Sequence, residues 1–169
     1  KLSTLLKDVE TLNVYEDVEV ERVTDNNKDN LENALYVCID GNRVDGHSLA
    51  KAAVKMGAVA VLTSYDLGIV NQIIVKNTRQ AYAKISANFY GNPAEKLKLI
   101  GVTGTNGKTS TAFFIKGILE NIGKKCGIIG TVKNCVGNSE SEATLTTPEP
   151  MKLHKLFSQM VDNGCEYCV

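Results

Sequence analysis

Residues 99–109 read LIGVTGTNGKT: a short apolar run, a glycine-containing loop and then Lys-Thr. The run 99–102 is typical of a buried strand, and residues 108–122 carry apolar side chains at helical spacing. Glycines between a strand and a helix let backbone N–H groups approach a phosphate, while the helix directs its positive end at the anion. The stretch therefore predicts a nucleotide-binding α/β domain with a parallel sheet.

The loop departs from the strict phosphate-loop pattern GxxxxGK[ST], which requires a glycine where this chain has Val102. Lys108 and Thr109 nevertheless hold the two reactive positions. We predict that Lys108 binds the β- and γ-phosphates and takes part in catalysis, and that the Thr109 hydroxyl ligates Mg²⁺. A ligand-free glycine turn is the alternative, but it does not explain Lys-Thr at a helix start. The predicted ATP contacts are Gly104, Thr105, Asn106, Gly107, Lys108, Thr109 and Ser110.

Upstream of this stretch, apolar runs of strand length alternate with segments of helical periodicity. The predicted strands are 18–23, 35–39, 58–62 and 72–75, and the predicted helices are 3–8, 47–56 and 78–90. This alternation indicates an α/β domain. The polar segment 93–98 separates it from the nucleotide-binding section, so we predict two domains, 1–97 and 98–169.

Downstream of the loop, we expect a strand, an exposed turn or hairpin, a helix and a final strand. Their predicted ranges are 126–132, 134–141, 151–162 and 165–169. The residues available for the buried side of the helix at 108–122 are Phe113, Ile115, Ile118, Leu119 and Ile122. A parallel nucleotide-binding sheet needs strands on both sides of the strand that carries the loop. Because only three strands are expected here, we predict a truncated domain.

The composition excludes several classes of protein. The chain has 169 residues, 43% of them hydrophobic and 22% charged, with a formal net charge of zero. These values are ordinary for a globular protein and give no support to a broad nucleic-acid-binding surface. No apolar run reaches the roughly 18 residues that a membrane span needs, and residues 1–10 lack the apolar core of a signal peptide. We expect a cytoplasmic protein with no nucleic-acid or membrane partner.

The five cysteines are interpreted as buried thiols. Their odd number and irregular spacing do not suggest a disulfide framework. Cys165 and Cys168 match the pattern C-x-x-C, but positions i and i+3 of a strand point to opposite faces. The two sulfurs would then not converge on a metal, and no second pair completes a zinc site.

The loop and its context resemble the Mur ligase family. The sequence GTNGKT at 104–109 looks like the form found in Mur ligases and in folylpolyglutamate synthetases, which join an amine to a carboxylate through an acyl phosphate. Residues 24–27 (TDNN), 35–39 (LYVCI) and 40–47 (DGNRVDGH) resemble the N-terminal domain of the Mur ligases that add the third residue or the terminal dipeptide to the muramyl peptide. The folate enzymes lack such a segment, so this part separates the two groups.

Residues 145–149 (LTTPE) narrow the resemblance further. They match the Thr-Thr-Pro segment of the branch that adds the third residue, which contacts the UDP-muramyl dipeptide. The dipeptide-adding branch usually carries Asn-Asn there, and the folate enzymes carry Ser-Pro-His. In this family the strand like 165–169 runs into a Glu-Val-Ser-Ser segment whose glutamate binds Mg²⁺. The resemblance extends from about residue 15 to the end of the chain.

The resemblance implies a small α/β N-terminal UDP-binding domain followed by a truncated parallel-sheet ATP-binding domain. The implied enzyme is a cytoplasmic, monomeric ATP- and Mg²⁺-dependent amide ligase of peptidoglycan synthesis, acting in cell-wall formation, cell shape and cell division. It would add L-lysine or meso-diaminopimelate to UDP-N-acetylmuramoyl-L-alanyl-D-glutamate. The implied substrate contacts are Thr24, Asn26, Asn42, Arg43, Val44, Thr146 and Thr147. We expect the isolated chain to be inactive, because the family's Mg²⁺-binding glutamate, carbamylated lysine and C-terminal domain lie beyond Val169.

One triplet departs from the family pattern. Asp-Ser-Arg is here 25–27 (DNN), so Asn26 keeps a short polar group while Asn27 lacks a guanidinium. Arg43 is a candidate substitute for that charge. Taken alone, 25–27 is also turn chemistry, and 146–149 is also a helix start with an early proline.

The dipeptide-adding ligase and a non-catalytic nucleotide-binding relative are the two rival functions, and the intact Lys108-Thr109 pair argues against the second. We interpret His47 as a helix-start or surface residue, and Asp45-Gly46 as a turn.

Overall fold

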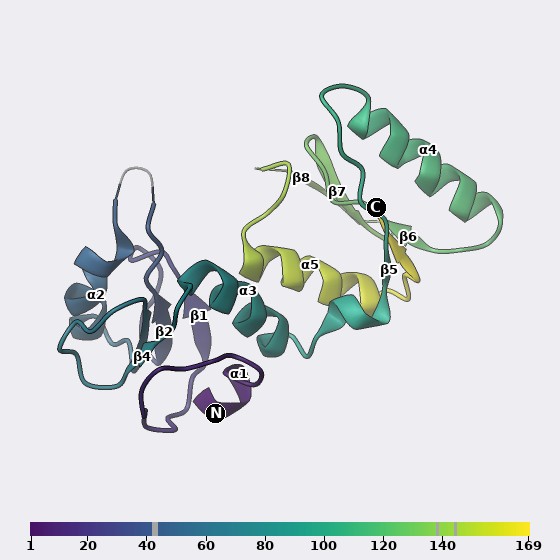
Figure 1. The fold of residues 1–169 in the computed structure, drawn as a ribbon. Helices are drawn as coiled ribbons and strands as arrows, with labels where there is room; N and C mark the ends of the chain where they lie inside the picture. Colours follow the sequence, from purple (N-terminus) through teal and green to yellow (C-terminus); the bar gives the residue numbers. More distant parts are fainter. Residues whose placement is uncertain (42–43, 138, 144) are drawn as a thin grey trace. The chain divides into compact units, whose positions relative to one another are not determined.

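The computed structural model describes residues 1–41, 44–137, 139–143 and 145–169 (Figure 1). They form two compact units, Lys1–Phe89 and Tyr90–Val169, which we call unit 1 and unit 2. The division thus falls eight residues before the predicted one at 97/98, which remains a sequence-based assignment. Leu97 belongs to the hydrophobic cluster of unit 2, so the polar segment around it packs with the second unit.

Unit 1 is a parallel four-stranded sheet with helices, as the alternating pattern predicts. Its strands pair in the sequential order β1-β2-β3-β4. They are β1 (Arg22–Thr24), β2 (Ala34–Val37), β3 (Ala60–Thr63) and β4 (Gln72–Ile74). The helices are α1 (Leu2–Leu5), α2 (Gly46–Lys55) and α3 (Thr78–Phe89). The first strand is shorter and later than the predicted 18–23, because only its end pairs with β2.

The core of unit 1 lies around its two central strands. Every residue of β2 and of β3 is buried, which explains why both are continuous apolar runs rather than alternating ones. Ala50 and Ala53 of α2 are fully buried in the same cluster as Tyr36 and Val61. Small side chains at these helix positions allow α2 to pack closely on the sheet.

Unit 2 contains a second parallel sheet and a separate hairpin. The order of the parallel sheet is β5-β9-β6, with both pairs parallel. The elements are η1 (Pro93–Lys96), β5 (Lys98–Leu99), α4 (Lys108–Asn121), β6 (Cys126–Gly127), β7 (Lys133–Val136), β8 (Ser139–Glu142), α5 (Pro150–Asp162) and β9 (Tyr167–Cys168). The predicted α/β class is therefore confirmed for both units, and the expected hairpin is the antiparallel pair β7–β8.

The long helix α4 differs from the prediction in its packing. It begins at Lys108, as its sequence indicates, but none of its residues is buried. Ile118 and Ile122, predicted for its buried side, are 65% and 67% exposed, and Phe114 is 71% exposed. Apolar residues at helical spacing set the helix, but their burial depends on a partner surface. The other described residues of unit 2 do not bury this side of α4.

Candidate functional site

The phosphate-loop candidate connects β5 to α4 in unit 2. Gly104 and Gly107 have φ values of +147° and +77°, conformations that glycine adopts without a Cβ penalty. Gly107 is the N-cap of α4, so the helix starts directly behind the loop. The Nζ atom of Lys108 donates to the Gly104 carbonyl oxygen at 2.5 Å. The lysine side chain thus folds back over the loop that precedes it.

A cavity of about 260 Å³ in unit 2 is lined by two predicted site segments that lie far apart in the sequence. Lys108 and Thr109 line it from the start of α4, and Thr146 and Thr147 line it from the segment before α5. The Thr131 hydroxyl donates to the Thr146 hydroxyl at 3.3 Å, and Thr131 lines the same cavity. The remaining predicted ATP contacts are exposed and lie outside this lining: Gly104, Thr105, Asn106, Gly107 and Ser110.

The lining of this cavity holds a second cation that no sequence motif indicates. Lys133, at the start of β7, forms an ion pair with Glu140 at 2.6 Å and lies 5.3 Å from the centre of the Phe113 ring. The hydrogen bond from Lys133 to Glu140 raises the pKa of the lysine, so Lys133 is positively charged. Two lysines, several hydroxyls and an apolar wall form an environment suited to an anionic ligand with an apolar part.

In unit 1, two of the predicted substrate contacts are engaged in a local turn. The Thr24 hydroxyl donates to Asp29 at 2.6 Å and accepts the Asn26 backbone N–H at 3.0 Å. The Asn26 side-chain amide donates to the other Asp29 oxygen at 3.0 Å, and its oxygen accepts the Lys28 N–H. Thr24 and Asn26 therefore hold the turn after β1 in place, and their polar groups already have partners.

The other predicted contacts of unit 1 follow β2. Asn42 and Arg43 lie outside the described residues, whereas Val44 is described and is 55% exposed. Asp40 and Asp45 form an isolated antiparallel bridge on either side of this segment. The segment thus begins and ends at neighbouring points on the carboxyl side of β2.

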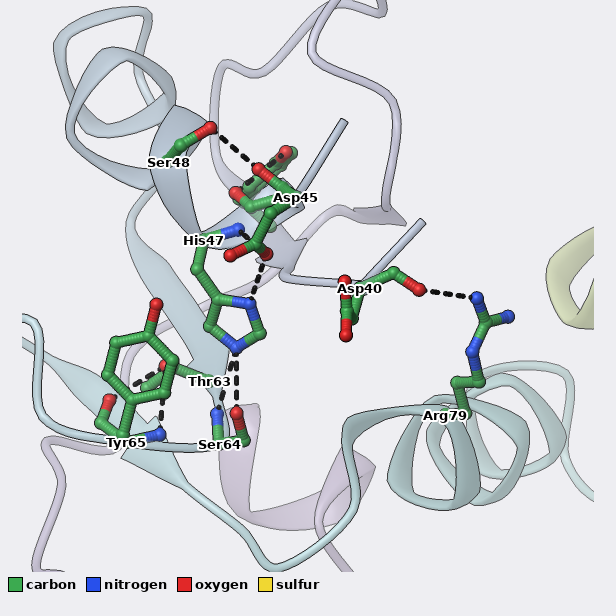
Figure 2. A network of polar contacts seen from close by, with 10 residues as sticks. Asp40, Asp45, His47, Ser48, Thr63, Ser64, Tyr65 and Arg79 are labelled. Atoms are coloured by element: carbon green, nitrogen blue, oxygen red, sulfur yellow. Dashed lines mark hydrogen bonds and ion pairs between the residues drawn. The ribbon is translucent and has the colours of Figure 1, made fainter. Parts of the chain in front are cut away.

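His47 differs from its interpretation as a surface residue. It does lie at the start of α2, but it is only 6% exposed and contacts Asp45, Ser64 and Tyr65 (Figure 2). Ser64 and Tyr65 directly follow β3, 17 and 18 residues farther along the chain. No local pattern could have indicated this contact, because the fold alone brings the two segments together.

The cysteines confirm the sequence-based interpretation. All five are free and buried. Burial raises the pKa of Cys38 and Cys168 to about 12 and that of Cys126 to about 11, so these thiols are protonated at neutral pH. Within the described ranges, no group of three or more His, Cys, Asp or Glu residues could hold a metal ion. The same ranges contain no helix that is both long and apolar enough to cross a bilayer.

Comparison with protein families gives two adjacent matches. The Mur ligase family catalytic domain model matches residues 30–90, and the Mur ligase middle domain model matches residues 102–169. The second match contains the loop and the Thr146-Thr147 segment, and the first contains the segment between β2 and α2.

Individual relatives agree with these matches. The chain is 44% identical over 173 residues to the UDP-N-acetylmuramoyl-L-alanyl-D-glutamate–2,6-diaminopimelate ligase of Clostridium perfringens, covering 99% of this chain and 36% of the relative. It is 42% identical to the ligase of the same name from Alkaliphilus metalliredigens, covering 100% of this chain and 35% of the relative. The chain therefore spans about a third of the length of these relatives.

Solved structures share the fold. A structure of a UDP-N-acetylmuramoyl-L-alanyl-D-glutamate–2,6-diaminopimelate ligase matches with a TM-score of 0.73 and 19% identity, over 92% of this chain and 33% of that one. Crystal structure I of MurF from Acinetobacter baumannii matches with a TM-score of 0.63 and 17% identity, over 99% of this chain and 34% of that one.

Proposed function

Because the chain belongs to the Mur ligase family, we propose that it is the N-terminal part of an ATP-dependent ligase that adds diaminopimelate to UDP-N-acetylmuramoyl-L-alanyl-D-glutamate. The observation that carries the proposal is the cavity on which Lys108 and Thr109 meet Thr146 and Thr147. The names of the relatives favour diaminopimelate over lysine as the added amino acid. The reaction belongs to peptidoglycan synthesis, and thus to cell-wall formation, cell shape and cell division.

The proposed chemistry proceeds in two transfers. ATP gives its γ-phosphoryl group to the side-chain carboxylate of D-glutamate, forming an acyl phosphate and ADP. The amine of diaminopimelate then attacks the acyl carbon, an amide bond forms, and phosphate leaves together with the amine proton. The protein's contribution to such transfers is mainly positioning and neutralisation of charge.

Lys108 is the residue proposed to act directly on the transferred group. Its ammonium lies at the start of α4, where the positive end of the helix also faces the loop. On binding ATP it would exchange the Gly104 carbonyl oxygen for β- and γ-phosphate oxygens, which are stronger, charge-assisted acceptors. The loop backbone at 104–107, together with Ser110, would supply the remaining phosphate contacts.

Mg²⁺ fits this donor set. Thr109 is exposed and lines the cavity beside Lys108, and a hydroxyl oxygen is a ligand that Mg²⁺ accepts alongside phosphate oxygens. When bound, the ion would offset negative charge on the phosphates. In our proposal Thr109 contributes one ligand and Lys108 a separate positive charge.

Contacts to the muramyl-peptide substrate are proposed for each unit by itself. Thr146 and Thr147 would hold its peptide end in the cavity of unit 2. The UDP end would be held on unit 1 by Thr24, Asn26, Asn42, Arg43 and Val44. Because Thr24 and Asn26 are bonded to Asp29, these two act by shaping the turn as much as by direct contact. We propose a cytoplasmic monomer with no nucleic-acid or membrane partner, in accordance with its nucleotide substrates.

The test is ligation by a polypeptide that extends this chain to the length of its relatives. Given ATP, Mg²⁺, diaminopimelate and the UDP-muramyl dipeptide, it should release ADP and form the tripeptide product, and the same polypeptide with Lys108→Ala should not. Product formed only from the UDP-muramyl tripeptide and a dipeptide would instead assign the dipeptide-adding activity. ATP binding without ligation of either substrate would assign a non-catalytic nucleotide-binding role.

A further inference from the structure

His47 anchors a small cluster at the carboxyl edge of the unit 1 sheet (Figure 2). We call Asp45, His47, Ser64 and Tyr65 the His47 cluster. The His47 ring is almost fully buried, and the Tyr65 ring stacks on it at 4.7 Å with an interplanar angle of 15°. Both nitrogens of the ring contact polar partners, Nδ1 on the Asp45 side and Nε2 on the Ser64 side.

The hydrogen bonds of the ring determine which of its two nitrogens carries the hydrogen in the neutral form. The Ser64 backbone N–H donates to Nε2 at 3.2 Å, and a backbone N–H can only donate. Nε2 is therefore an acceptor, and the proton resides on Nδ1, which donates to the Asp45 carboxylate at 2.6 Å. Hydrogen bonds from the His47 backbone N–H and from its ring lower the pKa of Asp45, so that carboxylate is charged.

The same connectivity occurs in catalytic Ser-His-Asp triads, but the geometry favours a structural clamp. A triad base needs its Nε2 lone pair for the serine hydroxyl proton. Here the backbone N–H of Ser64 shares that lone pair with the Ser64 hydroxyl, which lies 2.9 Å away. Tyr65 also covers one face of the ring. The cluster therefore ties the residue before α2 to the end of β3.

Asp45 is held in place directly after Val44, one of the predicted substrate contacts. Its side chain caps α2 by accepting the His47 N–H at 2.9 Å, and its backbone pairs with Asp40. Gly46 donates its N–H to the Ile39 carbonyl at 2.9 Å, and a Cβ at Gly46 would lie 2.8 Å from the Ile39 nitrogen. Only glycine permits so close an approach, so Gly46 keeps the start of α2 against the backbone of Ile39.

Arg79 holds Asp40, which pairs with Asp45, in place. From the first turn of α3 its guanidinium donates to the Asp40 carbonyl oxygen at 2.7 Å (Figure 2). Asp40 is thus tied to α3, and Asp45 is tied to β3 through His47. Ligands of parallel α/β sheets bind at this carboxyl edge, so two distant elements hold Asp40 and Asp45 where a ligand would meet them.

We propose that His47 is a positioning residue for the nucleotide-sugar substrate: by bonding Asp45 to Ser64, it holds Val44 in place at the carboxyl edge of the sheet. This inference rests on the proposed function and adds to it a residue that does not itself touch the substrate. Val44 is 55% exposed and directly precedes Asp45, so a displacement of Asp45 moves a predicted contact residue.

The experiment compares three variants of the whole chain. His47→Phe keeps the aromatic stack on Tyr65 but removes both polar contacts of the ring. His47→Asn retains a donor near the position of Nδ1 and is the conservative rescue. Ser48→Ala is the matched control, because it removes a different hydrogen bond of the same helix turn, the one from Ser48 Oγ to the Asp45 carbonyl oxygen at 2.7 Å. Each variant is titrated with UDP-N-acetylmuramoyl-L-alanyl-D-glutamate and with ATP at a temperature where it is folded.

We expect His47→Phe to weaken the UDP-sugar affinity about tenfold, the size of one lost hydrogen bond to a charged group. His47→Asn and Ser48→Ala should remain near the wild-type affinity, and ATP affinity should not change in any variant. Wild-type affinity in folded His47→Phe would overturn the proposal. An equal loss in Ser48→Ala would also overturn it, because fraying of α2 would then suffice.

A second measurement distinguishes a failure of the positioning role of His47 from a failure of the proposed substrate. Hydrogen exchange at the Gly46 amide reports directly on whether Asp45 and its neighbours are held in place. If the wild type does not bind the UDP-sugar, the proposed substrate of unit 1 is wrong. Faster Gly46 exchange in His47→Phe, with exchange in β3 unchanged, then still supports the positioning role, and unchanged Gly46 exchange contradicts it.

Discussion

Units 1 and 2 start from the same alternation of apolar runs and helical segments, but they pack differently. In unit 1 the strands β2 and β3 are buried at every position, and α2 packs against them through fully buried alanines. In unit 2 the strands of the parallel sheet are two residues long, and α4 has no buried residue. Sequence periodicity therefore determines the type of element, whereas burial depends on which partner surfaces the chain supplies.

The two units also differ in how their predicted site residues are used. In unit 1, the side chains of Thr24 and Asn26 form hydrogen bonds with Asp29 in the turn after β1. In unit 2, Lys108 and Thr109 face a cavity that also receives residues from a segment nearly forty positions away. We therefore propose that Thr24 and Asn26 act by shaping the turn of unit 1, while Lys108 and Thr109 of unit 2 contact a ligand directly.

The largest expected effect comes from truncating matched isoleucines in the two units. Ile73 in β4 is fully buried, whereas Ile118 in α4 is 65% exposed. Ile73→Ala should lower the free energy of unfolding by about 2–5 kcal/mol, because it removes buried methyl groups and leaves a cavity. Ile118→Ala should change it by less than about 0.5 kcal/mol, as an exposed substitution does. Urea unfolding followed by circular dichroism measures both values.

Equal losses in the two variants would break the comparison. They would mean that α4 is covered by a surface in solution and that the exposed stripe of Phe114, Ile118 and Ile122 is not free.

The second effect concerns ligand binding by unit 2. Lys108→Ala should weaken ATP binding about 10- to 100-fold, since a hydrogen bond to a charged group contributes about 1.5–3 kcal/mol. Thermal unfolding should hardly change, because the present partner of Lys108 is an exposed carbonyl of the loop. Lys116→Ala is the control: it removes a lysine from the same helix, one that pairs with Glu120 rather than with the loop. Similar losses in both variants would indicate a general effect of positive charge on α4.

The smallest effect sharpens the role of the loop glycines. Gly107 has a left-handed φ of +77° with open space at its Cβ position, and Gly117 lies inside α4 with open space as well. Gly107→Ala should destabilise the chain by about 1–2 kcal/mol through backbone strain. Gly117→Ala should stabilise it by up to about 1 kcal/mol, because alanine is the better helix former. Thermal unfolding curves give the two signs, and a stabilising Gly107→Ala would contradict the strained loop.

Much of the fold could be predicted because its signals are local. The strands at 35–39, 58–62 and 72–75 are apolar runs between turn residues, and the helix at 108–122 follows a glycine cap. The same locality explains the recognition of the loop: glycines, lysine and threonine occupy adjacent positions. The class and the order of elements follow from such segments without knowledge of their contacts.

The remaining features depend on contacts between distant residues. The exposure of Ile118 depends on what α4 packs against, and the place of Lys133 on the cavity depends on its approach to Phe113 of α4. His47 was recognised as a helix start, but its burial depends on Ser64 and Tyr65 after β3. Spacing in the sequence carries no information on such meetings, because the sheet topology decides them.

The most direct test of the account is calorimetric titration of this chain with UDP-N-acetylmuramoyl-L-alanyl-D-glutamate, with UDP and the UDP-muramyl tripeptide as controls. We predict tighter binding of the dipeptide form than of either control, because Thr146 and Thr147 on the unit 2 cavity are proposed to hold the peptide end of the substrate. Equal affinity for UDP and the dipeptide form would contradict the role of the two threonines. Tighter binding of the tripeptide form would contradict the proposed substrate.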